Sequence, residues 1–551
     1  MSARRSMWVS GRGPPGSGLL LKSAWMWMSP RREAETSRGF PCRVAQGLLL
    51  AGAVLVPLTH SSTAAAGTPS AARSATGAPF SPPVTHKRSA GTQLARTPEQ
   101  SRLEAADARM AAIYAAWPVI RPPTPEAPPT HPYQERFFGN WAGLLPHLSQ
   151  YGITLSANYL GMAVGNVAGG MRRGVDYAGQ ISTALDVDWG RLANMHGFST
   201  HLFLLNRTGR PVGRDYVGDS VFNENEIYGA GGNVIAHLGY AFAEQKLWHE
   251  RLDLMAGRMG AAMLFNASPL YCDFFSFGLC PTPRAITGGS QNAFIMPPQN
   301  NWSFYASLLL AHDVYLRSGI NAVGGPLGGR SGFNWSSHGV TGVMLPFEAG
   351  WTPRWGADHK PFHLQAGFYG ATAQADDIAL NRVHQLRALA GGQPLEHRGY
   401  LAAWAGGDIM ILRQTSAPDG GLVAFFNYNH SDDRISPYRD MGILGAEDRG
   451  FWSTRPQDRL GFLFLWSRQS HWLAQHQKRA GMENVGVGSI GSMNAEIGNI
   501  QSQTGLLEFQ YGAHIAPGTI LTPDVQYVIR PGATGRYHNA TVLGASLQAS
   551  L

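Results

Sequence analysis

The chain carries little charge, few cysteines and only one long apolar run. Asp, Glu, Lys and Arg make up 15% of its 551 residues, whereas soluble globular domains average about a quarter. No basic block follows residue 66, which argues against nucleic acid as a partner. No Gly-x-Ser-x-Gly sequence and no strand–helix–strand rhythm occur, so an α/β enzyme fold is not favoured.

The apolar run spans 44–58, follows Arg43 and precedes three alanines that end at Ala66. A positive residue, an apolar stretch and small residues in this order are typical of a secretory signal, and the run is too short for a comfortable membrane helix. We expect residues 1–66 to be an upstream segment and signal peptide, with cleavage after Ala66 and with Met28 as an alternative start. Their removal lowers the formal net charge from +8 to about +2.

Cysteine is scarce, since only Cys42, Cys272 and Cys280 occur. Cys42 lies within the expected upstream segment, and the other two would reside in an oxidising compartment. We expect Cys272 and Cys280 to form a disulfide, with free thiols or metal ligation as the alternatives. No further ligands are spaced for a metal, because His471 and His476 are five residues apart and do not share a helical face. We expect no metal and no cofactor.

Residues 67–132 differ in composition from both flanks. Residues 67–97 are rich in Ala, Ser, Thr, Pro and Gly, which predicts disorder. Thr97 and Pro98 then predict a helix start. Apolar residues follow at spacings of three and four: Leu103, Ala106, Met110, Ile113 and Trp117. This helix could form a short coiled coil, lie against a barrel mouth or remain an exposed surface helix, and seven prolines between residues 118 and 132 predict a stiff spacer.

From residue 133 the dominant pattern is alternation of apolar and polar residues. The final segment keeps it to the last residue, with apolar side chains at Leu543, Ala545, Leu547, Ala549 and Leu551. Similar alternation begins at Ile153, Ile181, Phe362, Leu507 and Val525. Such strands are typical of a wall between lipid and water, although a β-sandwich has the same pattern.

The remaining length is sufficient for a large barrel. Roughly 420 residues follow residue 132, enough for about sixteen strands of about ten residues with short turns and longer loops. Because no other long apolar run occurs, any membrane crossing must use strands. The sequence therefore predicts an all-β protein: a transmembrane antiparallel β-barrel over 133–551, with sixteen strands favoured, after a short helix and a Pro-rich linker in 67–132.

Several segments resemble the carbohydrate-selective porin (OprB) family. They are Phe138-Gly-Asn-Trp-Ala-Gly, Leu252-Asp-Leu-Met-Ala-Gly-Arg-Met with the aromatic cluster 274–277, Glu348-Ala-Gly-Trp-Thr-Pro, and Pro523-Asp-Val-Gln-Tyr-Val-Ile-Arg-Pro-Gly. Their order and spacing carry the resemblance from about Phe137 to the end. One departure is Leu551, since the family commonly ends on Phe.

The resemblance implies a sixteen-stranded barrel in the bacterial outer membrane through which carbohydrates diffuse passively. Monosaccharides such as glucose would enter the periplasm by this route, and the protein would not be an enzyme. Its partners would be outer-membrane lipid and carbohydrate substrates, and assembly into a homo-oligomer stays open.

Selective passage of a sugar requires donors and acceptors at the narrowest point, because a sugar is neutral and rich in hydroxyls. Arg258 is a candidate with five N–H donors. It shares strand parity with Leu252 and Leu254, so a bulge after Gly257 would decide its face. We expect Arg258 to face the lumen, because a charge facing lipid is costly.

The segment 266–301 is long for a turn and holds both remaining cysteines and an aromatic cluster. It could fold inward and narrow the channel, with Asp273 and Arg284 as polar contributors, or form a surface loop stabilised by a disulfide. The polar faces of the last strands carry further lumen candidates: Glu508, Gln510, Asp524, Gln526 and Arg530. Each of these could contact sugar or only make the wall polar.

Two other functions remain open from the sequence. An outer-membrane barrel enzyme would need a catalytic constellation built from scattered residues. A secreted β-sandwich that binds or cleaves sugar would use paired carboxylates for cleavage. A passive porin that prefers carbohydrates is the favoured function.

Overall fold

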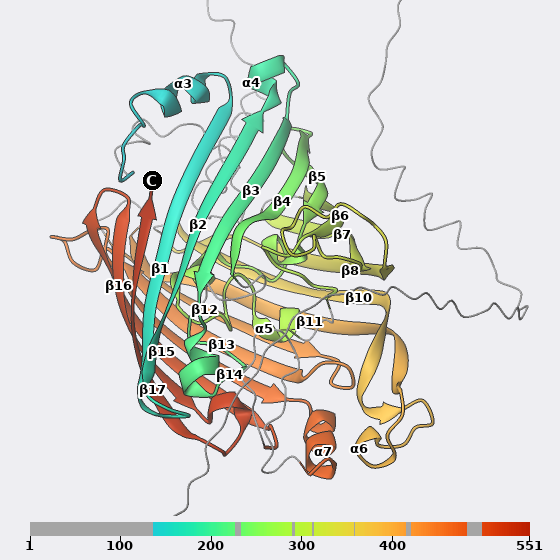
Figure 1. The fold of residues 1–551 in the computed structure, drawn as a ribbon. Coiled ribbons are helices and arrows are strands. Elements are labelled where there is room, and N and C mark those ends of the chain that lie inside the picture. Colours follow the sequence, from blue (N-terminus) through green and yellow to red (C-terminus); the bar gives the residue numbers. More distant parts are fainter. Residues whose placement is uncertain are drawn as a thin grey trace, which may run out of the picture. The chain divides into compact units, whose positions relative to one another are not determined.

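The computed structural model describes residues 136–225, 233–288, 292–310, 313–357, 359–414, 420–481 and 499–551 (Figure 1). The expected signal peptide, the amphipathic helix and the Pro-rich linker lie outside these residues. Within them, no helix is both long and apolar enough to span a membrane.

Strands dominate the described chain. The first nine are β1 (Ile153–Gly170), β2 (Gly174–Asp188), β3 (Phe198–Gly209), β4 (Val234–Leu247), β5 (Leu252–Met259), β6 (Asn301–Leu309), β7 (Val314–Gly324), β8 (Val340–Trp351) and β9 (Arg354–Trp355). The others are β10 (Lys360–Asn381), β11 (Pro394–Arg413), β12 (Gly421–Ser431), β13 (Tyr438–Arg449), β14 (Arg459–Gln469), β15 (Gln503–Ala516), β16 (Thr519–Ile529) and β17 (His538–Ser550).

Short helices occupy some of the connections. The α-helices are α3 (Leu144–Gln150), α4 (Trp189–Ala193), α5 (Arg284–Gly288), α6 (Arg387–Ala390) and α7 (His471–Arg479). Further helical turns are η1 (Gly213–Val217), η2 (Ala261–Met263), η3 (Pro269–Asp273) and η4 (Pro531–Ala533).

The strands form one sheet that closes on itself. Strand β1 pairs antiparallel with both β2 and β17, so the first and last strands meet (Figure 1). The two-residue β9 pairs with β10, while β8 and β10 also pair directly and continue the wall. Sixteen strands therefore make the closed wall. This confirms the predicted antiparallel barrel and excludes the β-sandwich.

Alternation divides each strand between two faces. On β17, Leu543 and Leu547 are exposed, whereas Val542 is fully buried. On β15, Leu507 is exposed and the adjacent Glu508 is buried. The exposed large apolar side chains thus face outward, where a membrane barrel meets lipid. The interior face carries buried polar side chains together with buried apolar ones such as Leu463 and Val542.

The last strand closes the barrel where the alternation predicts it. Ser550 lies opposite Asn158, and the backbone N–H of Leu551 donates to the carbonyl of Ala157 at 2.8 Å. The backbone N–H of Phe137 donates to the carbonyl of Ser550, also at 2.8 Å. A leucine in the last position therefore leaves the closing hydrogen bonds intact.

The two ends of the barrel differ in their connections. At one end, Pro517 and Gly518 alone join β15 to β16, and the C-terminus lies at this end. At the other end, long segments follow β3, β5, β7 and β14. This difference in length matches the expected outer-membrane barrel, in which short turns face the periplasm and longer loops face the outside of the cell.

Candidate functional site

Two long connections fold into the barrel. Of the connection after β3 the structure describes residues 210–225 and 233, and of the connection after β5, which we call the constriction segment, it describes residues 260–288 and 292–300. Their apolar side chains are buried against inward-facing wall residues. These buried side chains of the two segments include Phe222, Phe265, Phe274, Phe275, Leu279 and Phe294. Inward packing of these segments narrows the lumen.

Carboxylates on distant strands hold the constriction segment. Glu508 on β15 accepts the backbone N–H groups of Phe275 at 2.5 Å and Ser276 at 3.2 Å. Glu348 on β8 accepts the backbone N–H of Asn266 at 2.7 Å. Carboxyl oxygens satisfy these buried main-chain donors, so the two residues fix the segment across the lumen.

Glu348 also joins several wall strands. It is fully buried, accepts the indole N–H of Trp404 at 2.9 Å and pairs with Arg317 at 3.3 Å. Arg317 in turn donates to the carbonyl of Leu264 in the constriction segment at 2.8 Å. The buried charge is tolerated because a cation and N–H donors surround it. The sequence did not mark Glu348 or Arg317 as residues that hold the constriction segment.

Glu508, Gln510, Asp524 and Gln526 face inward, in agreement with the strand parity. The register places Glu508 opposite Gln526 and Gln510 opposite Asp524. All four are buried, because the inward segments cover them. Gln526 donates through Nε2 to the carbonyl of Glu224 at 3.0 Å. These side chains therefore lie beneath the inward segments and do not form an open lining.

Asp273 in the constriction segment keeps 20% of its side chain accessible. It forms an ion pair with Arg459 at the start of β14 and lies 4.0 Å from Arg449 at the end of β13. The preceding Cys272 is joined to Cys280 by a disulfide, with the two Cα atoms 4.7 Å apart. The disulfide closes the short loop that carries Asp273.

Arg258 does not line the lumen, contrary to our expectation. It lies opposite Trp302 on the strand face that carries the exposed Phe304, whereas Met259 belongs to an interior cluster. Its guanidinium is fully buried and donates to the side chain of Asn300 at 2.8 Å and to the carbonyl of Asn300 at 3.0 Å. The charge avoids lipid because neighbouring protein groups cover it.

Arg284 is buried, and Arg530 lies beyond the end of β16. Arg284 donates through Nε to the hydroxyl of Tyr438 at 3.1 Å and has its guanidinium carbon 5.1 Å from the centre of the Phe277 ring. Arg530 is exposed after β16 and donates to the hydroxyl of Ser502 at 2.9 Å. Arg284 therefore holds the constriction segment to β13, and Arg530 lies at the long-loop end.

Sequence reasoning also missed accessible groups on β2 and β3. Arg207 donates through Nε to Gln180 at 2.6 Å, and both side chains are half-buried on the inward face. Farther along, Arg210 pairs with Asp215 at 2.6 Å. Burial opposes ionisation of Asp215, but hydrogen bonds from Arg214 and Arg210 outweigh burial and lower the pKa of Asp215. Strand parity on β2 is the signal that marks Gln180 as inward.

Comparison with known proteins decides the identity of this barrel. Residues 172–551 match the family described as carbohydrate-selective porin, OprB family. The chain belongs to this family. Porin B of Pseudomonas aeruginosa is 25% identical over 428 residues, which cover 76% of this chain and 91% of Porin B. The putative porin QuiX of Acinetobacter baylyi is 22% identical over 422 residues, which cover 74% of this chain and 92% of QuiX.

A solved structure has the same fold as this porin. The high-pH structure of Pseudomonas putida OprB matches with a TM-score of 0.69 at 22% identity and covers 76% of this chain and 99% of that chain. The protein is thus a carbohydrate-selective porin of the bacterial outer membrane and not an enzyme. Across the described ranges of the porin, no cluster of His, Cys, Asp and Glu side chains could hold a metal ion.

Proposed function

We propose that this porin selects neutral monosaccharides such as glucose with polar side chains that stay accessible beside the constriction segment. Two pairs qualify: Asp273 with Arg449, and Gln180 with Arg207. Their partial exposure on the inward face is the observation that carries the proposal. The other inward polar residues that we considered are buried under the inward segments.

The chemistry of these pairs suits a neutral, hydroxyl-rich solute. The guanidinium of Arg449 presents several N–H donors, and 44% of its side chain is accessible. Arg449 also pairs with Glu447 at 3.2 Å. In the Asp273–Arg449 pair, opposite charges offer acceptors and donors to hydroxyl groups while presenting little net charge, which favours neutral sugars over ions. Gln180 and Arg207 add an amide and a guanidinium that can form hydrogen bonds with hydroxyl groups.

Sugar-dependent conductance in planar bilayers tests the proposal. Ion current through the wild-type porin should fall as glucose is added, because bound sugar occupies the narrow passage. R449A and R207A should each weaken the apparent sugar affinity by roughly ten-fold, since a hydrogen bond to a charged group contributes about 1.5–3 kcal/mol. R530A removes an exposed arginine at the long-loop end and is the matched control.

Two results would contradict this assignment. Channels whose current never responds to neutral sugars would remove the selectivity proposal and leave the barrel intact. An equal loss of affinity in R449A, R207A and R530A would show that the effect comes from general charge and not from the two proposed pairs.

We also propose the division of the chain. Residues 1–66 are removed on secretion, residues 67–132 remain as a periplasmic segment, and residues 133–551 form the barrel within outer-membrane lipid. The signal-like pattern that ends at Ala66 supports the first step. N-terminal sequencing of protein purified from the outer membrane tests it, and a protein that still begins at residue 1 would contradict it.

A further inference from the structure

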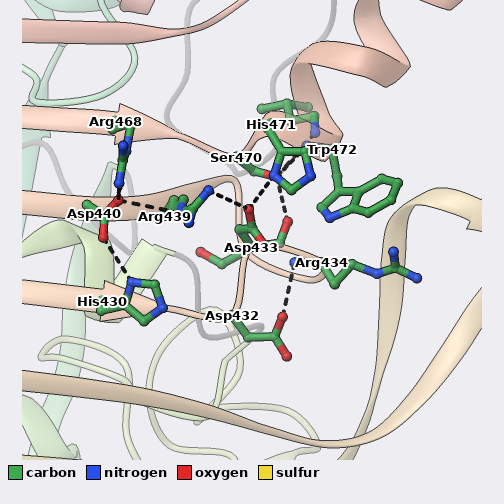
Figure 2. Close-up of polar contacts among 12 residues, drawn as sticks. His430, Asp432, Asp433, Arg434, Arg439, Asp440, Arg468, Ser470, His471 and Trp472 are labelled. Atoms are coloured by element: carbon green, nitrogen blue, oxygen red, sulfur yellow. Dashed lines mark hydrogen bonds and ion pairs between the residues drawn. The ribbon is translucent and has the colours of Figure 1, made fainter.

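A polar cluster lies on the outer face of β12, β13 and β14, near their long-loop ends. The register places His430 opposite Asp440, and Asp440 opposite Arg468. Further along the same face, Leu444 and Phe462 are exposed apolar residues. Strand parity therefore turns these polar side chains toward the surroundings of the barrel (Figure 2).

The centre of this outer polar cluster is the carboxylate of Asp440. It accepts hydrogen bonds from the hydroxyl of Tyr428 at 2.7 Å, from His430 Nδ1 at 2.9 Å and from Arg468 Nε at 2.8 Å. The Nε atom of Arg439 lies 3.6 Å from the same carboxylate. A carboxylate on a membrane-facing wall is costly unless it is fully paired, and here the pairing also fixes the position of each donor.

In the outer polar cluster the basic side chains are exposed, whereas the acidic Asp440 is buried. The side chain of Asp440 is 1% exposed, whereas those of Arg468, Arg439 and His430 are 48%, 39% and 54% exposed. The nearby Asp433 is 18% exposed and is engaged by His471 at 2.6 Å. The surface that an approaching group meets is therefore made mainly of N–H donors.

The outer polar cluster lies at the end of the barrel that carries the long loops. The β12–β13 turn follows directly, and α7 begins beside it at His471 (Figure 2). This is the long-loop end, which faces the outside of the cell. Side chains on the outer face at this level meet the headgroups of the outer leaflet. The exposed Tyr428 and the ring of Trp466, 5.9 Å from the Arg468 guanidinium carbon, have the amphipathic character of residues at a membrane interface.

We propose that Arg468, Arg439 and His430 bind a phosphate group of a phosphorylated glycolipid in the outer leaflet. Asp440 holds the Nε and Nη2 edge of Arg468, so phosphate oxygens would meet the remaining N–H donors of Arg468 together with those of Arg439 and His430. Charge-assisted hydrogen bonds of this kind are among the strongest in proteins. Asp440 is a positioning residue in this site, because it holds the three donors and is itself covered. The site lies on the outer face of the wall and is independent of the sugar pathway inside the barrel.

Lipid binding to the purified full-length porin in detergent tests the proposal. Lipid A with two phosphates, one phosphate and none is titrated while native mass spectrometry measures bound lipid. Wild-type affinity should fall stepwise as phosphates are removed, and it should weaken as salt rises. The double variant R439Q/R468Q should bind diphosphorylated lipid A roughly ten-fold more weakly.

R191Q is the matched control, because Arg191 is 45% exposed and pairs with Asp188 at 3.3 Å beside the opposite, short-turn end of the barrel. It should bind lipid A like the wild type. Wild-type affinity that does not depend on phosphate number would overturn the proposal, and this measurement does not require any variant to fold. Unchanged affinity in R439Q/R468Q, or a change in oligomeric state without a change in lipid binding, would overturn it as well. The last result would identify a second copy of the chain as the occupant.

Discussion

Glu508 and Asp273 both lie inside the barrel, but they differ in what surrounds them. Glu508 is 1% exposed and accepts two backbone N–H groups of the constriction segment. Asp273 belongs to that segment, keeps 20% of its side chain accessible and pairs with Arg459 and Arg449. An acidic residue on the wall thus anchors the segment, and an acidic residue on the segment meets the open lumen. Inward direction alone does not make a residue part of the sugar pathway.

Removal of the Glu508 carboxyl should have the largest effect on stability and conductance. E508A leaves the backbone N–H groups of Phe275 and Ser276 buried without an acceptor, at a cost of about 1–3 kcal/mol for each group. We expect a lower free energy of unfolding in urea and a higher single-channel conductance, because the constriction segment is released from β15. E508Q keeps one acceptor oxygen and should be intermediate. Wild-type conductance and stability in E508A would show that apolar packing alone holds the segment.

Loss of the disulfide should have the next largest effect. C272S/C280S removes a cross-link that closes a short loop, which contributes about 2–3 kcal/mol in the chain-entropy estimate. Thermal unfolding should shift downward, and the open-channel current should become noisier because the loop that carries Asp273 gains freedom. Mass analysis after alkylation, with and without reductant, checks the bond in the wild type. Two thiols that are alkylated without reductant would refute it.

Much of the wall could be predicted from local sequence. Alternation along β17 separates Leu543 and Leu547 from the residues between them, and alternation along β15 and β16 predicts that Glu508 and Gln526 face inward. The reason is that successive side chains of a strand point to opposite faces. The burial of Glu508 could not be predicted in the same way. It depends on Phe275, a residue 233 positions earlier in the chain, and no local pattern reports such a contact.

Arg258 shows how a sound argument from sequence can give the wrong face. Its parity with Leu254 pointed outward, but the cost of a charge facing lipid favoured the lumen. The structure keeps the outward register and covers the guanidinium with Asn300 and with the rings of Trp302 and Trp335. Trp335 lies in the β7–β8 connection, so the covering group could not be inferred from the strand itself.

Arg284 provides a smaller test of the difference between buried and accessible arginines. R284A removes a hydrogen bond to Tyr438 and a contact with the Phe277 ring, which together contribute about 1–3 kcal/mol. Stability should fall, and the apparent sugar affinity of the folded channels should stay within error of the wild type. R449A should do the reverse, with weaker sugar binding and little change in stability. Weaker sugar binding in R284A would place Arg284 in the pathway and remove the distinction.

Replacement of Glu224 should have the smallest effect, which is a change in how stability depends on pH. It is fully buried in the inward segment after β3, and burial together with the nearby charge of Asp219 raises its pKa well above the usual range. The folded protein therefore favours the protonated carboxyl. The contribution of protonated Glu224 to the free energy of unfolding is fully present below the ordinary Glu pKa of about 4.3. It is lost as pH rises through the raised pKa of Glu224 in the folded protein.

E224Q cannot ionise, so its stability should decline less than that of the wild type as pH rises from mildly acidic to alkaline. Thermal unfolding in detergent across this range measures the two slopes. E396Q removes an exposed carboxyl that pairs with Arg382 and controls for the change in overall charge. Parallel curves for the wild type and E224Q would mean that Glu224 ionises equally in both states, and the segment that carries it would then have to be open to water inside the barrel.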